Sequence, residues 1–446
     1  MPVSDQEIAS LVEPARVHKR VYTDPAIFDL EMERIWGNAW IFIGHESQVK
    51  KPGDYFTTTI GRQSVIVTRH SDDQVHVMYN RCAHKGAQLA GESCGHAQKL
   101  RCAYHGYVFD TAGKLLHIPR EEGYAGSLFE RDKPLANIRK VARVEIYRGF
   151  IFANQAQQGP DLKSWLGPAI TSFDNAVERS PTGEIEITGG VLRYMHDANW
   201  KILLENVSDN LHPAVTHQSA WQPAKQLARQ FPENEKPLPL AMLEPFGSSY
   251  EFFDTIAMTT CGNGHTWSGG NATIHIGYPR ESKYVQDMVA AYGEEKTNQI
   301  LSMQRQNTII YPSIAFKSAL QTIRVYHPIA VDKTIQETWT FKLGGVSDDM
   351  LHTSVLYNQL IFSPFSIAGH DDYEAYHRIQ HGLQTEASEW VSQHRHFGRD
   401  QPGDDGTTRA LGTSDIVFRH EFEAWKDYMT LSVDDIHVET ARENQV

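Results

Sequence analysis

Two short segments, 80-NRCAHKG-86 and 101-RCAYHGYVFD-110, decide how this chain folds. Each segment contains one cysteine and one histidine, in CxH order in the first and CxxH order in the second. Thiolates and neutral imidazoles together suit a [2Fe-2S] cluster, because thiolates hold one iron while imidazoles on the other iron remove negative charge and raise the reduction potential. The pattern therefore predicts an iron-sulfur site.

The ligands follow from the needs of each iron, which requires two protein ligands beside its bridging sulfides. We assign Cys82 and Cys102 to one iron, and His84 and His105 to the other. A zinc site is the alternative, since two cysteines and two histidines also bind zinc. Zinc fingers favour a cysteine pair and a histidine pair separated by a helix, whereas each segment here mixes the two residue types. The mixed order of cysteine and histidine in each segment favours a [2Fe-2S] cluster over zinc.

The surroundings of these segments are rich in β-branched and aromatic residues. Strand-like runs lie at 41–47, 64–70, 75–80, 99–110 and 143–154, separated by Gly, Asp and Pro. Residues 25–40 instead space their apolar side chains as an amphipathic helix does. We expect an all-β domain over 41–155, preceded by a helical segment over 1–40 that packs on the next domain.

Composition limits the remaining choices. A chain of 446 residues is long enough for two domains. The 55 acidic residues outnumber 42 Lys and Arg, and the net charge of −13 argues against a nucleic-acid partner. The N-terminus lacks a signal-type apolar core, and no apolar run is long enough to span a membrane. We expect a cytoplasmic protein without a membrane partner.

The polar stretch at 154–161 marks a change from short strands to longer helices and strands. We expect the second domain, 156–446, to be α+β with an antiparallel sheet. Predicted strands lie at 184–196, 248–260, 271–278, 308–327 and 335–343. Predicted helices lie at 199–212, 281–305, 347–362 and 371–394.

A second group of metal-binding residues occurs in 199-NWKILLENVSDNLHPAVTH-217. On a helix Asp209 and His212 share one face, whereas His212 and His217 would be about 140° apart. Pro213 removes a backbone donor and can loosen that turn, which would bring His217 toward the same point. Two imidazoles and one carboxylate on Fe(II) leave positions open for dioxygen.

The carboxylate has to come from elsewhere in the chain, and the acidic pair Asp371 and Asp372 is the best source. This pair opens a predicted helix, where acidic side chains suit the helix dipole. The spacing alone does not choose between the two acids.

The segments NRCAHKG and RCAYHGYVFD resemble the Rieske motif of aromatic-ring-hydroxylating non-haem iron oxygenases, and specifically their alpha subunits. The NWK and EN..D..H....H pattern with a late acidic pair extends the resemblance over nearly the whole chain. It implies an N-terminal Rieske domain and a catalytic domain of helix-grip, START-like fold. Leu211 departs from the pattern, because many relatives have Tyr before the first histidine.

The resemblance also implies site residues. His212, His217 and the second acid, Asp372, would bind the mononuclear iron. Asp209 would bridge the two metal centres, and the EN pair Glu205 and Asn206 would belong to the same catalytic helix.

The implied activity is that of a terminal oxygenase. The cluster would take single electrons from a ferredoxin or reductase that oxidises NAD(P)H, since the chain contains no GxGxxG fingerprint of its own. The mononuclear iron would use them with O2 to dihydroxylate or monohydroxylate an aromatic ring. The family also implies a homotrimer in which one subunit's cluster lies beside its neighbour's iron, with or without a beta subunit.

The substrate is suggested by the members that act on aromatic acids such as terephthalate, anthranilate and salicylate. Arg324 resembles a substrate-binding arginine of the terephthalate enzymes, and Lys317 lies on the preceding strand. Phe362 and Ile367 are candidate pocket walls. The alternatives are a monooxygenase or demethylase acting on a quaternary ammonium or methoxy compound, an electron carrier, and a helix-grip domain that only binds a ligand.

Overall fold

The computed structural model describes residues 3–232, 235–270, 273–275 and 280–431, and these form two compact units. One unit combines the chain up to Ile35 with the chain from Pro160 onward, and we call it the catalytic unit. The other, the cluster unit, is Trp36–Gly159. In sequence, the cluster unit is therefore inserted between the N-terminal helices and the rest of the unit to which they belong.

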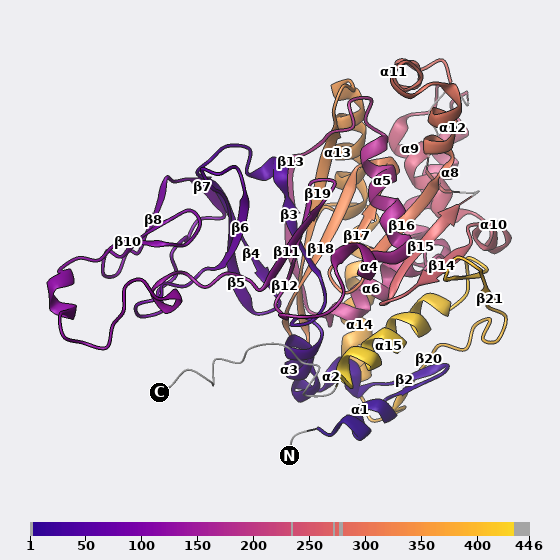
Figure 1. Cartoon of the computed structure of the whole chain (residues 1–446). Coiled ribbons are helices and arrows are strands. Elements are labelled where there is room, and N and C mark those ends of the chain that lie inside the picture. Colours follow the sequence, from indigo (N-terminus) through magenta and orange to yellow (C-terminus); the bar gives the residue numbers. More distant parts are fainter. Residues whose placement is uncertain (1–2, 233–234, 271–272, 276–279, 432–446) are drawn as a thin grey trace. The chain divides into compact units, whose positions relative to one another are not determined.

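The cluster unit is built from antiparallel strands, as the alternating β-branched runs predict. Its strands form three groups (Figure 1): β3 (Ile41–His45), β12 (Phe150–Asn154) and β11 (Arg143–Tyr147); β4 (Asp54–Ile60), β5 (Gln63–Arg69), β6 (Val75–Tyr79) and β7 (Cys94–His96); and β8 (Lys99–Arg101), β9 (Val108–Asp110) and β10 (Leu115–His117). The predicted run 99–110 is thus two strands, β8 and β9, with the second Cys/His segment as the loop between them.

The catalytic unit contains an antiparallel sheet that has nine strands among the described residues, in the order β13-β19-β18-β17-β16-β15-β14-β22-β21. The bounds are β13 (Ile185–His196), β14 (Met258–Cys261), β15 (His265–Gly270), β16 (Gln304–Ile310), β17 (Ile314–Lys317), β18 (Thr322–Ala330), β19 (Lys333–Leu343), β21 (Gln401–Pro402) and β22 (Thr407–Ala410). The α+β class with an antiparallel sheet is confirmed.

Helices cover this sheet and carry the second metal-binding segment (Figure 1). Helix α6 (Trp200–Ser208) packs on β15, β16 and β18, while α13 (Asp348–Phe362) packs on β19. Helix α14 (Gly369–Leu383) contacts α6, and so does α15 (Ile416–Met429). The Asn199 side chain caps α6 by accepting a hydrogen bond from the Lys201 amide.

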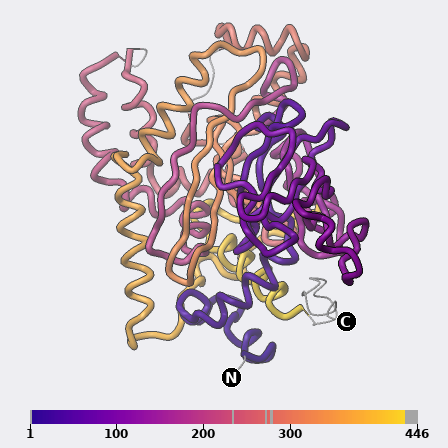
Figure 2. Tube along the Cα trace, turned by 90° about the vertical axis from the view of Figure 1, so that its left-hand side faces the viewer, coloured from indigo at the N-terminus to yellow at the C-terminus, as the bar shows by residue number. Residues whose placement is uncertain are grey.

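Glu31 joins the N-terminal helices to this core. It lies on α3 (Pro25–Arg34), is fully buried, and accepts hydrogen bonds from Trp200 (2.9 Å), Lys201 (2.5 Å) and Trp425 (2.7 Å). Figure 2 shows the N-terminal helices beside α15 at the yellow end of the chain, in agreement with the contacts of α1 (Asp5–Ser10) and α3 with α15.

Several predicted elements are wrong in extent. The region 248–260 begins as helix α10 (Tyr250–Thr255), because the Ser249 hydroxyl caps it at the Phe252 amide, and only Met258–Cys261 is a strand. The predicted helix 281–305 is two helices, α11 (Lys283–Tyr292) and α12 (Glu294–Ser302), which meet at Gly293 with a φ of +79°. The predicted strand 308–327 is a meander of β16, β17 and β18.

Other boundaries also shift. The predicted strand 271–278 lies mostly outside the described residues, and β15 ends before it at Gly270. The helix predicted over 371–394 ends at Leu383, and β20 (Trp390–Ser392) then pairs with β2 (Arg16–His18). The N-terminal helix ends at Arg34 instead of residue 40, and α15 was not predicted.

Candidate metal centres

The two Cys/His segments fold into the same turn. In the first, the Cys82 amide donates to the Ala87 carbonyl and the Gly86 amide donates to the Cys82 carbonyl. In the second, the Cys102 amide donates to the Tyr107 carbonyl and the Gly106 amide donates to the Cys102 carbonyl. Gly86 and Gly106 have φ values of +75° and +74°, which favour glycine. The repeated turn places a cysteine at its start and a histidine near its tip.

The four side chains converge. Cys82 and Cys102 are buried, and the rings of His84 and His105 lie 4.7 Å apart. Nδ1 of each histidine is buried without a hydrogen-bond partner, which is what a nitrogen reserved for a metal shows. Burial opposes ionisation of Cys102, but the amides of Tyr104 and His105 lower the pKa of its thiol. These residues fit a [2Fe-2S] cluster.

The second metal-binding segment differs from the predicted single helix. Helix α6 ends at Ser208, and Asp209 adopts an extended conformation. The Asp209 carboxylate accepts hydrogen bonds from the Leu211 amide (2.6 Å) and the His212 amide (3.2 Å), a local pattern that competes with helix continuation. A new short helix, α7 (Pro213–Thr216), then begins with Pro213 at its first position.

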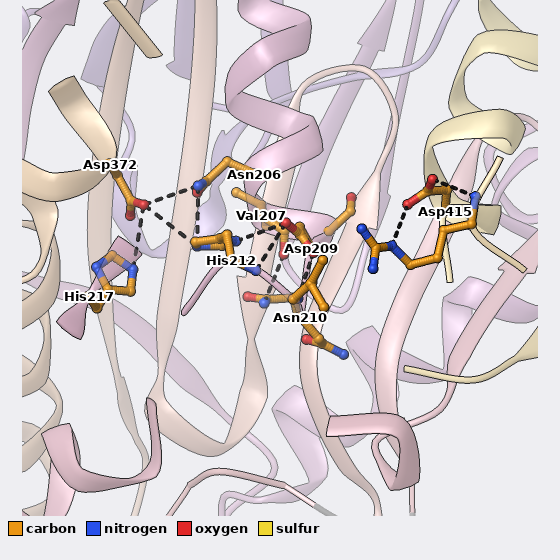
Figure 3. Close-up of polar contacts among 12 residues, drawn as sticks. Asn206, Val207, Asp209, Asn210, His212, His217, Asp372 and Asp415 are labelled. Atoms are coloured by element: carbon orange, nitrogen blue, oxygen red, sulfur yellow. Dashed lines mark hydrogen bonds and ion pairs between the residues drawn. The ribbon is translucent and has the colours of Figure 1, made fainter. Parts of the chain in front are cut away.

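This break brings the ligands together. His212 and His217 flank α7, and each Nε2 lies near Oδ1 of Asp372, at 3.6 and 3.5 Å respectively. The ligand atoms of His212, His217 and Asp372 all lie within 4.8 Å of one another. In the described part of the chain, no other three histidine, cysteine or acidic side chains bring their ligand atoms this close together. Figure 3 shows the three side chains pointing toward one another. Two histidines and one carboxylate fit Fe(II) with positions left open.

Neighbouring groups orient these ligands (Figure 3). The Asn206 amide nitrogen lies 3.1 Å from Asp372 Oδ1 and 3.3 Å from His212 Nε2. The Tyr376 hydroxyl donates to Asn206 Oδ1 at 2.8 Å and so fixes which way the amide faces. Tyr376 was not predicted, and its contact spans 170 positions of sequence, so that no local spacing signals it.

Asp209 lies on the far side of His212, with Oδ2 at 3.2 Å from Nδ1. Burial opposes the charge on His212, but the hydrogen bond and charge of Asp209 raise the pKa of the imidazole. The same contact lowers the pKa of Asp209 despite its burial. A carboxylate on the outer nitrogen of a ligand histidine fixes its tautomer and ring orientation.

Two other predicted acids lie outside the triad. Asp371 Oδ2 accepts a hydrogen bond from Ser219 (2.9 Å) and lies 3.6 Å from His217 Nδ1, the nitrogen facing away from Asp372. Glu205 instead has Tyr22 and Lys201 as its neighbours, and burial raises the pKa of its carboxyl to about 7.

The candidate substrate residues differ in how deeply they are buried. Arg324 is buried, lies 4.6 Å above the Phe362 ring, and donates to Asn307 at 3.2 Å. Its positive charge acts on His212, where it lowers the pKa of the imidazole against the effect of Asp209. Lys317 is buried as well. Ile367 is 53% exposed and therefore does not form a buried wall.

Comparison with known proteins agrees with both centres. Residues 39–139 match the Rieske [2Fe-2S] domain family, and residues 186–428 match the ring hydroxylating alpha subunit (catalytic domain) family. The alpha subunit of benzene 1,2-dioxygenase from Pseudomonas putida is 31% identical over 394 residues, covering 83% of this chain and 80% of the relative. The large subunit of 2-halobenzoate 1,2-dioxygenase from Burkholderia cepacia is 29% identical, and the match covers 90% of this chain and 84% of the relative.

Solved structures show the same fold. Naphthalene 1,2-dioxygenase with indole bound has a TM-score of 0.77 at 22% identity, covering 96% of this chain and 95% of the other. A quaternary ammonium Rieske monooxygenase with L-carnitine bound has a TM-score of 0.63 at 16% identity, covering 96% of this chain and 99% of the other.

A Rieske domain followed by a site of two histidines and one carboxylate defines an iron-dependent oxygenase. The chain belongs to the family of ring-hydroxylating oxygenase alpha subunits. Its cofactors are one [2Fe-2S] cluster and one mononuclear iron, and the family draws electrons from a ferredoxin or reductase. Within the described residues, no helix is both long and apolar enough to cross a membrane.

Proposed function

We propose that this oxygenase hydroxylates an aromatic carboxylate and that Arg324 binds the carboxylate of the substrate. The observation that carries the proposal is the state of Arg324: it is 6% exposed and has no acidic partner among the described residues. An unpaired buried cation is costly, so a bound anion would compensate it. A guanidinium matches a carboxylate with two parallel hydrogen bonds.

The proposed reaction is cis-dihydroxylation. One arene, one O2, two electrons and two protons give one cis-diol, with both oxygen atoms retained on the ring. His212, His217 and Asp372 would hold the iron, which when bound supplies oxygen activation. Asn206 orients Asp372, Asp209 orients His212, and Arg324 would fix the ring by its carboxylate.

The relatives are named both for neutral arenes and for aromatic acids. Those named for acids include 2-halobenzoate 1,2-dioxygenase and toluate 1,2-dioxygenase. A quaternary ammonium substrate is disfavoured, since its positive charge would lie close to that of Arg324, and like charges repel strongly where water is excluded.

We further propose a cytoplasmic homotrimer supplied with electrons from NAD(P)H through its partner protein, with or without a beta subunit. In such a trimer Asp209 would link the cluster histidine His105 of one subunit to His212 of the next. The support is that Asp209 is already bonded to His212 and that His105 lies near the tip of its turn.

The test is oxygen uptake and product analysis with benzoate, toluene and phenyltrimethylammonium, in the presence of 18O2. We expect benzoate to give a diol that carries two labelled atoms. Arg324→Met should raise KM for benzoate about 100-fold. The exposed Arg378→Met is the matched control and should change nothing. Turnover of toluene but not of benzoate by the wild-type enzyme would overturn the proposal.

A further inference from the structure

The ring of His84, in the first Cys/His turn, is covered by a tyrosine from the second. Tyr107 lies at the end of the second turn, where its carbonyl accepts a hydrogen bond from the Cys102 amide. Its ring stacks on the ring of His84, with the ring centres 4.6 Å apart and the two planes 5° from parallel. Tyr107 is 4% exposed. One face of the His84 imidazole is therefore closed to solvent by a single buried aromatic ring.

A second tyrosine connects this stack to the surface. The hydroxyl oxygens of Tyr107 and Tyr124 lie 2.5 Å apart and share a hydrogen bond. Tyr124 is the last residue of a short 3-10 helix (Glu121–Tyr124), is half-buried, and packs against the ring of Phe129 with the ring centres 4.7 Å apart. Tyr124, Tyr107 and His84 thus form a continuous line of contacting groups from solvent to the cluster site.

Two exposed cations beside His84 lack acidic partners. Lys85 follows the histidine directly, and Arg81 lies over the same turn, since a Cβ on Gly86 would meet Arg81 Nε at 3.0 Å. Neither cation pairs with a carboxylate among the described residues, in a chain whose net charge is −13. Their local excess of positive charge suits a negatively charged protein partner.

The segment that carries Tyr124 does not add to this charge, because its cations are paired. The pairs are Arg120 with Glu122, Arg131 with Glu121, and Lys133 with Glu130. Arg131 also donates to the Leu116 carbonyl and so fixes the segment to the end of β10.

We propose that electrons enter the cluster on the side of His84, through Tyr124 and Tyr107, from an acidic one-electron carrier protein that docks against Arg81 and Lys85. The inference rests on the proposed function, which takes His105 as the side from which electrons leave. The two histidines belong to different turns, so that a carrier and a neighbouring subunit can be bound at once.

The electron balance of this step is simple. The carrier loses one electron and the cluster gains one, and neither tyrosine is oxidised or exchanges its proton. The hydrogen bond and the ring stack act as a bridge, because electron tunnelling weakens less through closely packed or hydrogen-bonded atoms than across a gap.

The test is stopped-flow reduction of the intact, oxidised holoenzyme by a reduced, acidic plant-type [2Fe-2S] ferredoxin, whose potential is low enough to reduce a Rieske cluster. Tyr107→Phe/Tyr124→Phe keeps both rings and removes their hydrogen bond, and we expect it to be reduced about ten-fold more slowly than the wild type. Tyr124→Leu also removes the outer ring and should be slower still. Tyr250→Phe, at an exposed tyrosine of the catalytic unit, is the control.

Three further measurements separate an electron route from a structural support. Acid-labile sulfide per chain and the midpoint potential of the cluster should match the wild type in each tyrosine variant. A single turnover by enzyme that was reduced beforehand should also keep its rate, because no electron then has to enter. Loss of the cluster, a changed potential or an equally slowed single turnover would overturn the route.

Ionic strength tests the role of the two cations. From about 0.05 M to about 0.5 M salt, the second-order rate constant of the wild type should fall about ten-fold or more, because screening weakens the attraction. Arg81→Met/Lys85→Met should be slower at low salt and lose most of this dependence, unlike the control Lys333→Met/Arg378→Met, which changes two exposed cations of the catalytic unit. A wild-type rate constant that does not vary with salt would overturn docking of an acidic carrier.

Failure of this inference can be told apart from failure of the proposed function. If the tyrosine variants accept electrons as fast as the wild type while the previously reduced enzyme converts benzoate, the entry route is wrong and the proposed function stands. If the previously reduced enzyme forms no diol from benzoate although the tyrosine variants are reduced slowly, the proposed function fails and the entry route stands.

Discussion

At the scale of single residues, Asp209 combines two roles in one carboxylate. It caps the turn that follows α6 through the amides of Leu211 and His212, and it bonds the outer nitrogen of the His212 ring. The first role shapes the loop, and the second orients a proposed metal ligand. Neither role makes Asp209 a ligand itself, so its loss should affect turnover more than metal content.

We therefore expect Asp209→Ala to retain both the cluster and the mononuclear iron but to lose about 100-fold or more of its turnover. Iron and acid-labile sulfide per chain, together with product formation, measure the two effects. The exposed Asp349→Ala serves as control. Full activity in Asp209→Ala would refute the proposed bridging role.

The buried carboxyl of Glu205 should make the stability of the protein depend on pH. Its carboxyl is raised from an ordinary pKa of 4.5 to about 7 by burial, so the folded protein binds the proton more tightly than the unfolded chain does. The stabilisation of the folded state by Glu205 is fully present below about pH 4.5 and is lost as the pH rises through about 7. The loss is up to about 3 kcal/mol in the free energy of unfolding.

Glu205→Gln keeps the shape of the side chain but cannot ionise. Denaturant unfolding of both proteins at a series of pH values isolates the effect. The difference in stability between the variant and the wild type should widen in favour of the variant from about pH 4.5 to about pH 7, and then stay constant. A difference that does not vary with pH would show that the carboxyl is not perturbed.

At the scale of elements, the position of α6 depends on its neighbours. One end carries Lys201, which is buried and paired with Glu31 of α3, while the other end leads to Asp209 and the proposed iron ligands. Trp425 of α15 donates to the same glutamate. The helix that precedes the metal site is thus held by an N-terminal and a C-terminal helix at once.

Removing Glu31 should destabilise the catalytic unit, because it leaves the ammonium of Lys201 buried without its counter-charge. We expect Glu31→Gln to cost about 3 kcal/mol in denaturant unfolding. The double variant Glu31→Gln/Lys201→Met should lose less, since the ammonium that Glu31 neutralises is removed as well. The exposed Glu386→Gln is the control and should change stability by no more than about 0.5 kcal/mol.

At the scale of the whole molecule, the proposed trimer makes one subunit depend on the next. Cys102→Ser should lose the cluster and Asp372→Ala the mononuclear iron, and each variant alone should be inactive. Co-expressed in equal amounts, they should form mixed trimers in which an intact cluster meets an intact iron site at about one interface in four.

Activity of the mixed preparation would therefore be about a quarter of wild type under the proposed symmetry. Co-purification through a tag on only one variant, followed by native mass measurement, confirms that mixing occurred. Inactive mixed trimers would contradict transfer between subunits, and a monomeric mass would contradict the assembly itself.

The proposed cluster ligands could be read from the sequence, since Cys82, His84, Cys102 and His105 lie in two short turns whose glycines, Gly86 and Gly106, set the backbone locally. Hydrophobic periodicity is a local property, so the α+β class and most strands of the cluster unit were also predicted from the sequence, whereas β4, β7 and β10 were missed. The extent of the longer elements was less accessible, as the division of 281–305 at Gly293 shows.

Which groups meet across long stretches of chain became clear from the packing of the elements. It placed Asp372 beside His212 and His217 and Asp371 on the outer nitrogen of His217, a choice that two adjacent acids in sequence leave open. It placed Glu205 on the side of Tyr22 and Lys201, and it left Arg324 and Lys317 buried without acidic partners among the described residues. These facts depend on packing between elements far apart in sequence, and the spacing of residues along one segment carries no information about them.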